Sequence, residues 1–198
     1  AYSGSKVWGD NLGGVCTDNS RASSVVGPVD LSQCTSAGLF FRHYYLTEPF
    51  FDGGAVFAST DSGTTWEPLL PDGGYPFPVL DATGEPGHSG DSGGWTEAAF
   101  PLDAYGGVSD LLIKLEFQSD VAVAGLGWYA DDLEVVAACF PAQLEAAVRS
   151  RRPVYQSPSW GRAGLVTHVP DERDVGVRYR GAALVDGSRS PRSCRASR

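Results

Sequence analysis

The chain has 198 residues, of which 42% are hydrophobic and 11% aromatic, and its formal net charge is −9. This apolar content is enough to form a core, which excludes a chain that is disordered throughout. The longest apolar run, near residues 121–130, is much shorter than the ~20 residues of a membrane-spanning helix.

Acidic and basic residues are divided unevenly along the chain. Residues 1–140 carry 19 acidic and 4 basic side chains, whereas residues 141–198 carry 11 arginines and 5 acidic side chains. An acidic body repels phosphate backbones, which argues against nucleic-acid binding, and it suits cations such as calcium. We therefore expect a domain at 1–140 followed by a separate basic tail at 141–198. Because the chain contains no methionine, we also expect it to be a processed product or a fragment.

Eight short stretches have the apolar pattern of β-strands, with glycine, proline or aspartate turns between them. In chain order they are residues 6–8, 23–26, 39–46, 55–59, 65–70, 95–102, 111–118 and 127–137. A turn is expected at Gly27–Pro28, between the second stretch and the third. Eight such strands predict an all-β protein with a β-sandwich or jelly-roll fold.

The prediction of a β-sandwich depends mainly on two of these stretches. Residues 39–46, LFFRHYYL, are apolar and aromatic on both faces, so we expect a central strand between two layers. Residues 111–118 alternate, with leucine, isoleucine and phenylalanine on one face and mostly polar side chains on the other. This period of two is typical of a half-buried strand.

The tail has a different composition. Residues 141–152 predict a short helix, because Pro141 suits the first helical position and Leu144 and Val148 lie four residues apart. Beyond this helix, only residues 175–180 have a weak strand pattern. The Ser, Arg, Gly and Pro content predicts that the rest is largely irregular.

Four cysteines, at positions 16, 34, 139 and 194, show no C-x-x-C pairing, which argues against a zinc ribbon. Cys16 and Cys34 bracket one long loop. In an oxidising compartment we expect them to form a disulfide that stabilises the fold by roughly 3 kcal/mol. The alternative is that both are free buried thiols.

The segment Gly90-Asp91-Ser92-Gly93-Gly94 matches the surroundings of the nucleophilic serine in chymotrypsin-like proteases. That chemistry requires a histidine base, an orienting carboxylate and an oxyanion hole. His43 lies instead within a strand pattern typical of a core position, and His88 lies in a glycine-rich loop where we expect it to be solvated. No H-E-x-x-H motif is present. We therefore predict a structural loop and keep a serine hydrolase that uses Ser92 as a remote alternative.

Residues 59–66 fit the S-x-D-x-G-x-T-W pattern of an Asp-box, which is a hairpin turn. Its pattern positions are Ser59, Asp61, Gly63, Thr65 and Trp66. In such a turn the aspartate accepts turn amides, the glycine adopts a backbone conformation unfavourable to other residues, and the tryptophan packs under the loop. We predict a structural role for it.

Two pairs of acidic residues suggest a calcium site. Glu48 and Asp52 flank the turn after the central strand, and Asp131 and Asp132 follow a Gly-Trp-Tyr segment. Calcium takes six to eight oxygen ligands from carboxylates and carbonyls. Convergence of these loops predicts a calcium site with discontinuous ligands. The alternative is that the four carboxylates accept backbone amides in turns.

Several aromatic side chains have two possible roles. They could stack on the faces of sugars, or they could fill the core of a sandwich, which is the more frequent role of such residues. The residues concerned are Trp66, Tyr75, Phe77, Trp95, Trp128 and Tyr129.

An ordered set of segments carries a resemblance to one family. The segments are 3–9 (SGSKVWG), 27–32 (GPVDLS), the strand with Phe41, His43 and Tyr44, the residues 48–56, the Asp-box, 90–95, 117–120 and 127–133 (GWYADDL). Their order over residues 1–140 resembles the MAM-like β-sandwich domains that accompany immune inhibitor A-type metallopeptidases. It is also similar to the cleaved adhesin domains of gingipain-like proteins.

The resemblance implies a jelly-roll fold, secretion, and a non-catalytic accessory or adhesion role in a multidomain bacterial protein that is associated with a protease. The implied partners are neighbouring domains of the same polypeptide, and an extracellular protein or glycan. Some relatives bind calcium, which implies Glu48, Asp52 and Asp132 as ligands, and a calcium-dependent adhesin is the alternative function. Family members also have an earlier strand before the Ser-Gly segment, so we expect an N-terminal truncation that exposes a sheet edge.

Overall fold

A computed structural model describes residues 1–12, 14, 18–123 and 125–140, together with the backbone of 176–180. Its strands are β1 (Trp8–Gly9), β2 (Arg21–Val29), β3 (Cys34–Leu46), β4 (Gly53–Ser59), β5 (Glu67–Pro68), β6 (Thr96–Pro101), β7 (Leu111–Gln118), β8 (Gly127–Cys139) and β9 (Gly176–Arg180). One short 3-10 helix, η1 (Asp103–Tyr105), precedes β7. The predicted all-β sandwich is confirmed.

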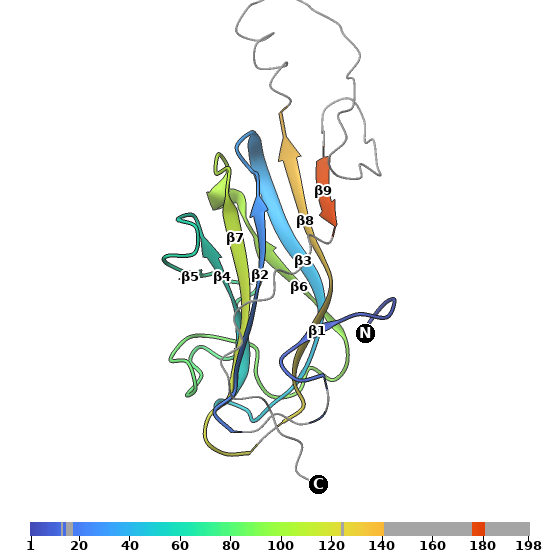
Figure 1. The fold of residues 1–198 in the computed structure, drawn as a ribbon, viewed down its shortest axis with the longest axis vertical. Coiled ribbons are helices and arrows are strands. Elements are labelled where there is room, and N and C mark those ends of the chain that lie inside the picture. Colours follow the sequence, from blue (N-terminus) through green and yellow to red (C-terminus); the bar gives the residue numbers. More distant parts are fainter. Residues whose placement is uncertain (13, 15–17, 124, 141–175, 181–198) are drawn as a thin grey trace, which may run out of the picture.

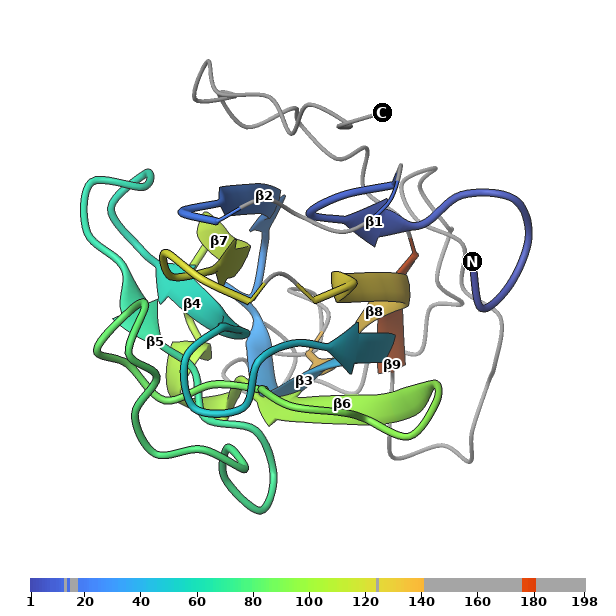
Figure 2. The same cartoon turned by 90° about the horizontal axis from the view of Figure 1, so that it is seen from below.

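The strands form two antiparallel sheets that face each other (Figure 1). The five-stranded sheet has the order β1-β8-β3-β6, and β9 also pairs with β8. The four-stranded sheet has the order β2-β7-β4-β5. Seen from below, β7 and β4 lie on one side of the molecule, and β8 and β9 lie on the other (Figure 2).

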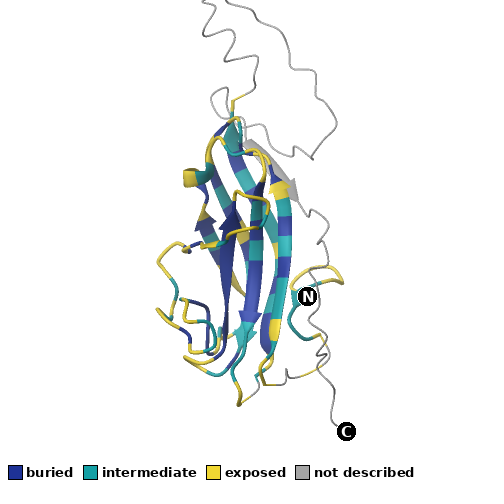
Figure 3. Ribbon diagram, turned by 60° about the vertical axis from the view of Figure 1, so that its left-hand side comes forward, coloured by how far each residue is buried: buried dark blue, intermediate teal, exposed yellow. Residues whose placement is uncertain are grey.

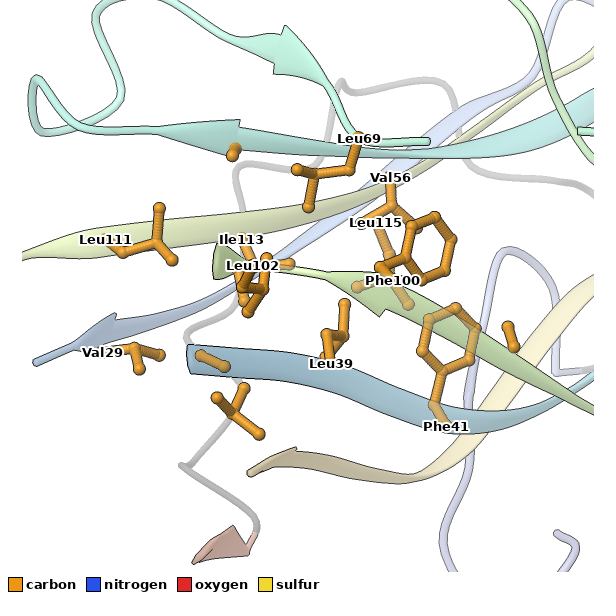
Figure 4. Close-up of a cluster of buried hydrophobic side chains, with 14 of the residues drawn as sticks. Val29, Leu39, Phe41, Val56, Leu69, Phe100, Leu102, Leu111, Ile113 and Leu115 are labelled. Atoms are coloured by element: carbon orange, nitrogen blue, oxygen red, sulfur yellow. The ribbon is translucent and has the colours of Figure 1, made fainter. Parts of the chain in front are cut away.

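Apolar side chains from both sheets fill the space between them. Burial alternates along most strands, as expected when one face of each sheet meets the core, whereas β4 is buried throughout (Figure 3). Leu39 and Phe41 from β3 meet Phe100 from β6 and the β4 and β7 residues Val56 and Leu115 (Figure 4). Burial of this shared interior is the main stabilising term of the fold.

Strand β7 has the bounds and the alternation that the sequence predicts. The four side chains of its apolar face, at positions 111, 113, 115 and 117, are at most 2% exposed. On the opposite face, Glu116 is only 7% exposed, because Arg21 and Lys114 each place a side-chain nitrogen 3.0 Å from its carboxylate. These partners hold the pKa of Glu116 below its usual value despite burial.

The predicted turn at Gly27–Pro28 is wrong, because both residues lie inside β2. The pairing of β2 with β7 shifts register between Val26 and Val29, which is the mark of a β-bulge. Gly27 has a φ of 127°, and a Cβ there would meet the Leu111 carbonyl oxygen at 2.7 Å. A bulge therefore absorbs the Gly-Pro pair within a continuous strand.

Strand β3 lies between β8 and β6, at the centre of its sheet, as predicted. Only its inner face is fully buried, since His43 is 3% exposed whereas Phe40 on the outer face is 37% exposed. Arg42 and Tyr44 on the outer face are half-buried. The expectation of a strand covered on both faces is therefore wrong for the part of the chain that the structure describes.

The structure pairs Cys34 with Cys139, so the predicted Cys16–Cys34 disulfide is wrong. These two cysteines face each other in the antiparallel pairing of β3 with β8. Sheet pairing brings together residues 105 positions apart in the sequence, and the spacing of cysteines along one loop gives no information about this. Cys16 and Cys194 lie outside the described residues.

The predicted strand at 175–180 is confirmed as β9, which pairs with residues 134–138 of β8. Near the start of β8, Trp8 and Gly9 of β1 pair with Ala130 and Tyr129. The predicted helix at 141–152 and most of the tail lie outside the described residues. Among the helical residues that the structure describes, none form a segment long and apolar enough to cross a membrane.

Candidate functional site

Ser92 of the protease-like segment lies in the long loop between β5 and β6. Its hydroxyl oxygen accepts the amide N–H of Tyr45 at 3.1 Å and lies within hydrogen-bond distance of the carbonyl oxygens of Tyr45 and Gly94, at 3.1 and 2.8 Å. The Ser92 amide also donates to the Tyr45 carbonyl at 3.0 Å. All of these partners are main-chain atoms, so the side chain attaches the loop to β3.

His43 points into the core from the inner face of β3, as predicted. Its Nδ1 accepts the indole N–H of Trp128, and the two nitrogens are 3.3 Å apart. A neutral imidazole has one acceptor nitrogen, so this hydrogen bond leaves none to take a proton from Ser92. Burial lowers the pKa of His43 to about 4. His43 therefore has neither the free nitrogen nor the basicity that a serine nucleophile requires.

His88 lies against His43, with 4.5 Å between the ring centroids. The expectation that His88 is solvated is wrong, because its side chain is only 7% exposed. Two backbone hydrogen bonds with Gly54, at 2.8 and 3.0 Å, fix this part of the loop beside β4. Burial and then the proximity of His43 lower the pKa of His88 to about 3, and its Nε2 has no hydrogen-bond partner.

Glu48 and Asp52 lie at the turn between β3 and β4, where Asp120 from the β7–β8 loop joins them. Asp52 is 1% exposed, and its carboxylate accepts the Asp120 amide at 2.9 Å. Burial raises the pKa of Asp52 to about 6, and the negative charges of Asp120 and Glu48 add to this effect. Asp120 completes this acidic group, and its separation from Asp52 by 68 residues means that no local sequence pattern indicates the contact.

Asp131 and Asp132 have different partners. Asp131 accepts the amides of Tyr2 and Ser3, and Asp132 accepts the Ser3 hydroxyl. Asp131 pairs with Arg42 in the five-stranded sheet, whereas Asp52 lies beside the start of β4 in the other sheet. Among the described residues, no three His, Cys, Asp or Glu side chains are arranged to hold a metal ion. The calcium site stays a prediction.

Ionisation of Asp52 should destabilise the domain. The pKa of Asp52 is higher in the folded chain than in the unfolded chain, so protonation of the carboxyl favours the folded state. This stabilisation is complete below pH ~4 and is lost as the pH rises through about 6. We expect Asp52→Asn to remove this loss, since an amide oxygen still accepts the Asp120 N–H. Urea unfolding between pH 4 and 7 measures the effect, and Asp81→Asn, at an exposed position, is the control.

If the stability of Asp52→Asn depended on pH in the same way as that of the wild type, Asp52 would not be a buried carboxylate with a raised pKa. The same pair of proteins, wild type and Asp52→Asn, tests the predicted calcium site. An ion that binds the ionised cluster adds stability by mass action, so calcium should raise the melting temperature of the wild type at pH 7 and leave Asp52→Asn less affected.

The turn at residues 59–66 has the geometry of an Asp-box. Asp61 accepts the Thr65 amide at 2.9 Å, Ser59 donates its hydroxyl to Asp61 at 2.8 Å, and the Gly63 amide donates to the Ser59 hydroxyl at 2.9 Å. These bonds hold the pKa of Asp61 at about 2, below its usual value. Gly63 has a φ of 85° and lies against Trp66. The motif closes a turn at the end of β4.

Four of the six aromatic residues divide between the core and the outer face of the five-stranded sheet, whereas Trp66 lies beside Lys114 and Phe77 packs on Phe50. Trp128 is fully buried. Tyr75 packs against the core, and its hydroxyl accepts the Val56 amide at 2.9 Å. Trp95 and Tyr129, by contrast, are half-buried and lie outside the core cluster. The sequence alone does not distinguish these two groups.

Comparison with known proteins gives one informative similarity. The chain is 30% identical over 133 residues to Bacillopeptidase F of Bacillus subtilis (strain 168). The alignment covers 67% of this chain but only 8% of that protein, so the matched region is a small part of the relative's length. No family model matches the chain.

Proposed function

We propose that the chain is a non-catalytic accessory module of a secreted, multidomain bacterial protein that is associated with a peptidase. The geometry of the GDSGG segment carries this proposal. Ser92 is bound to main-chain atoms, and the only acceptor nitrogen of neutral His43 is used by Trp128. In this arrangement the motif holds a loop on a β-sandwich.

The similarity to Bacillopeptidase F supports the context. A matched region that is 8% of the length of a larger protein is the relationship expected of a module. The Cys34–Cys139 disulfide supports secretion, because such bonds persist mainly in oxidising compartments. The MAM-like resemblance of residues 1–140 points to the same role, with neighbouring domains and an extracellular protein or glycan as partners.

Labelling with a fluorophosphonate probe tests the proposal. We expect the folded chain to show no covalent labelling of Ser92, because none of the side chains that the structure describes is placed to activate its hydroxyl. We expect Ser92→Ala to fold normally and to lose about 1 kcal/mol of stability with the removed hydrogen bond. Trypsin treated in parallel is the positive control. Labelling that disappears in Ser92→Ala would refute the accessory role and favour a serine hydrolase.

A further inference from the structure

The outer face of the five-stranded sheet carries aromatic rings that do not contribute to the core. Tyr44 from β3 lies between Trp95 and Tyr129, with ring centroids 6.1 and 6.2 Å away. Arg42, next to Tyr44 on the same face of β3, forms an ion pair with Glu97 at 2.9 Å. A half-exposed row of aromatic rings is typical of an interaction surface.

The N-terminal segment of the chain lies on this outer side, away from the four-stranded sheet (Figures 1 and 2). The ring of Tyr2 is 5.9 Å from that of Trp95, and the Arg42 guanidinium lies 5.3 Å above the Tyr2 ring. Tyr2 nevertheless remains 49% exposed. Its ring therefore occupies an open slot formed by an aromatic ring and a cation.

Two carboxylates of β8 hold the main chain of the same segment. Asp131 Oδ2 accepts the amide of Tyr2 at 2.7 Å and that of Ser3 at 3.1 Å. Asp132 Oδ1 accepts the Ser3 hydroxyl at 2.6 Å. Hydrogen bonds to an ionised carboxylate are among the stronger ones in proteins.

A β-bulge explains why adjacent residues of one strand both reach the segment. Between Phe40 and Arg42 of β3, the pairing partner on β8 moves by three residues, from Glu134 to Asp131. Asp132 lies at this irregularity with a φ of 50°. The extra residue breaks the alternation of side chains, so both carboxylates can face the N-terminal segment.

We propose that this surface is a binding site for an extended polypeptide that carries an aromatic residue followed by a hydroxyl residue, and that Tyr2 and Ser3 occupy it in cis. The site consists of Arg42, Trp95, Asp131 and Asp132 and borders a groove of about 1060 Å³. The contacts of Tyr2 and Ser3 with this site do not depend on their covalent connection to the sheet, so a separate peptide could form the same contacts. We favour a peptide over a glycan because the segment that occupies the site here is itself a polypeptide, held through two consecutive main-chain amides on one carboxylate.

The inference names a ligand class, so it goes beyond the accessory role and does not depend on it. An intramolecular ligand on a short tether acts at an effective concentration in the millimolar range. A free peptide of the same sequence should therefore bind weakly to the wild type and at least about tenfold more tightly once the slot is vacated. The full chain with Tyr2→Gly and Ser3→Gly provides the vacated site.

The experiment is a titration of both full-length proteins with the acetylated, amidated peptide AYSGSK, followed by ¹⁵N NMR. In the vacated variant we expect shifts at the Trp95 indole and the Asp131 and Asp132 amides, with a dissociation constant of about 0.1 mM, roughly tenfold below the effective concentration of the tethered segment. Adding Asp131→Asn should weaken binding about tenfold, because both amide bonds lose their ionic acceptor. The peptide AGGGSK, which has the same charge, is the control and should not bind.

Three results would overturn the inference. One is the absence of shifts at these positions in the vacated variant up to about 10 mM peptide. Another is equal affinity in the wild type and the vacated variant, which would show that Tyr2 and Ser3 do not occupy the site. The third is saturation of the same signals by a neutral oligosaccharide but not by the peptide, which would identify a glycan surface instead.

Discussion

Loss of the Cys34–Cys139 disulfide should lower the free energy of unfolding by about 4 to 5 kcal/mol. The bond closes a loop across 105 positions, and the loss of chain entropy in the unfolded state scales with the logarithm of that length. We expect Cys34→Ala with Cys139→Ala to show this loss in urea unfolding at pH 7 without reductant. The β3–β8 pairing should survive, because it continues from Ser36 to Leu46 of β3, beyond the position of the bond.

The other two cysteines provide the control. In Cys16→Ser with Cys194→Ser, peptide mapping should still find the Cys34–Cys139 bond. If the Cys16–Cys194 variant lost several kcal/mol and the Cys34–Cys139 variant did not, the native bond would involve different cysteines.

Acid should unfold the domain through its two buried histidines. Both pKa values are lower in the folded chain, about 4 for His43 and about 3 for His88, so the folded state binds fewer protons than the unfolded state below pH 6.5. Their contribution to stability is full above pH ~6.5 and is lost as the pH falls. Each histidine costs up to about 1.4 kcal/mol per pH unit over this range.

Between pH 6.5 and 4 the two histidines together should remove on the order of 6 kcal/mol, similar to the whole stability of many domains. Asp52 acts in the opposite direction over pH 4 to 6, so the loss should be steeper in Asp52→Asn than in the wild type. Chemical unfolding at half-unit pH steps measures both effects. A stability that stays constant from pH 7 to 4.5 in Asp52→Asn would contradict the burial of neutral histidines.

Replacement of His88 separates its contribution to acid unfolding from that of His43. His88→Phe keeps a ring of similar size beside His43, Tyr75 and Phe100, and it removes a buried nitrogen that has no hydrogen-bond partner. We expect this variant to lose about half of the acid sensitivity and to be at least as stable as the wild type at pH 5. If His88→Phe lost stability at low pH as steeply as the wild type, groups other than His88 would cause the acid unfolding.

Local patterns in the sequence were sufficient to predict much of the fold. The period-two alternation of residues 111–118 gave β7 with its bounds, because a strand at a half-buried face imposes that pattern on its side chains. The Asp-box could be predicted because all of its hydrogen bonds join residues within one short turn. Such features depend on neighbours in the sequence.

Features that depend on distant pairing could not be predicted in this way. Cys139 meets Cys34 only through the register of β3 and β8, and His88 is buried only because its loop returns to β4. The aromatic residues of β3 were assigned to two buried faces, whereas one face lies outside the core. Hydrophobic rings in a core and in a surface slot produce the same pattern, so composition alone does not separate them.

His43 lies in the core and Ser92 attaches a loop to β3, and the two side chains do not form a catalytic pair. An NMR titration of the His43 imidazole tests this claim most directly, because the ¹⁵N shifts report both the pKa and the nitrogen that carries the proton. Because we predict a pKa of about 4, the imidazole of the folded chain should stay neutral at every pH above the acid unfolding transition, with Nδ1 unprotonated and accepting the Trp128 indole N–H. A pKa near 7 that changes in Ser92→Ala would contradict the claim and indicate a general base beside a nucleophile.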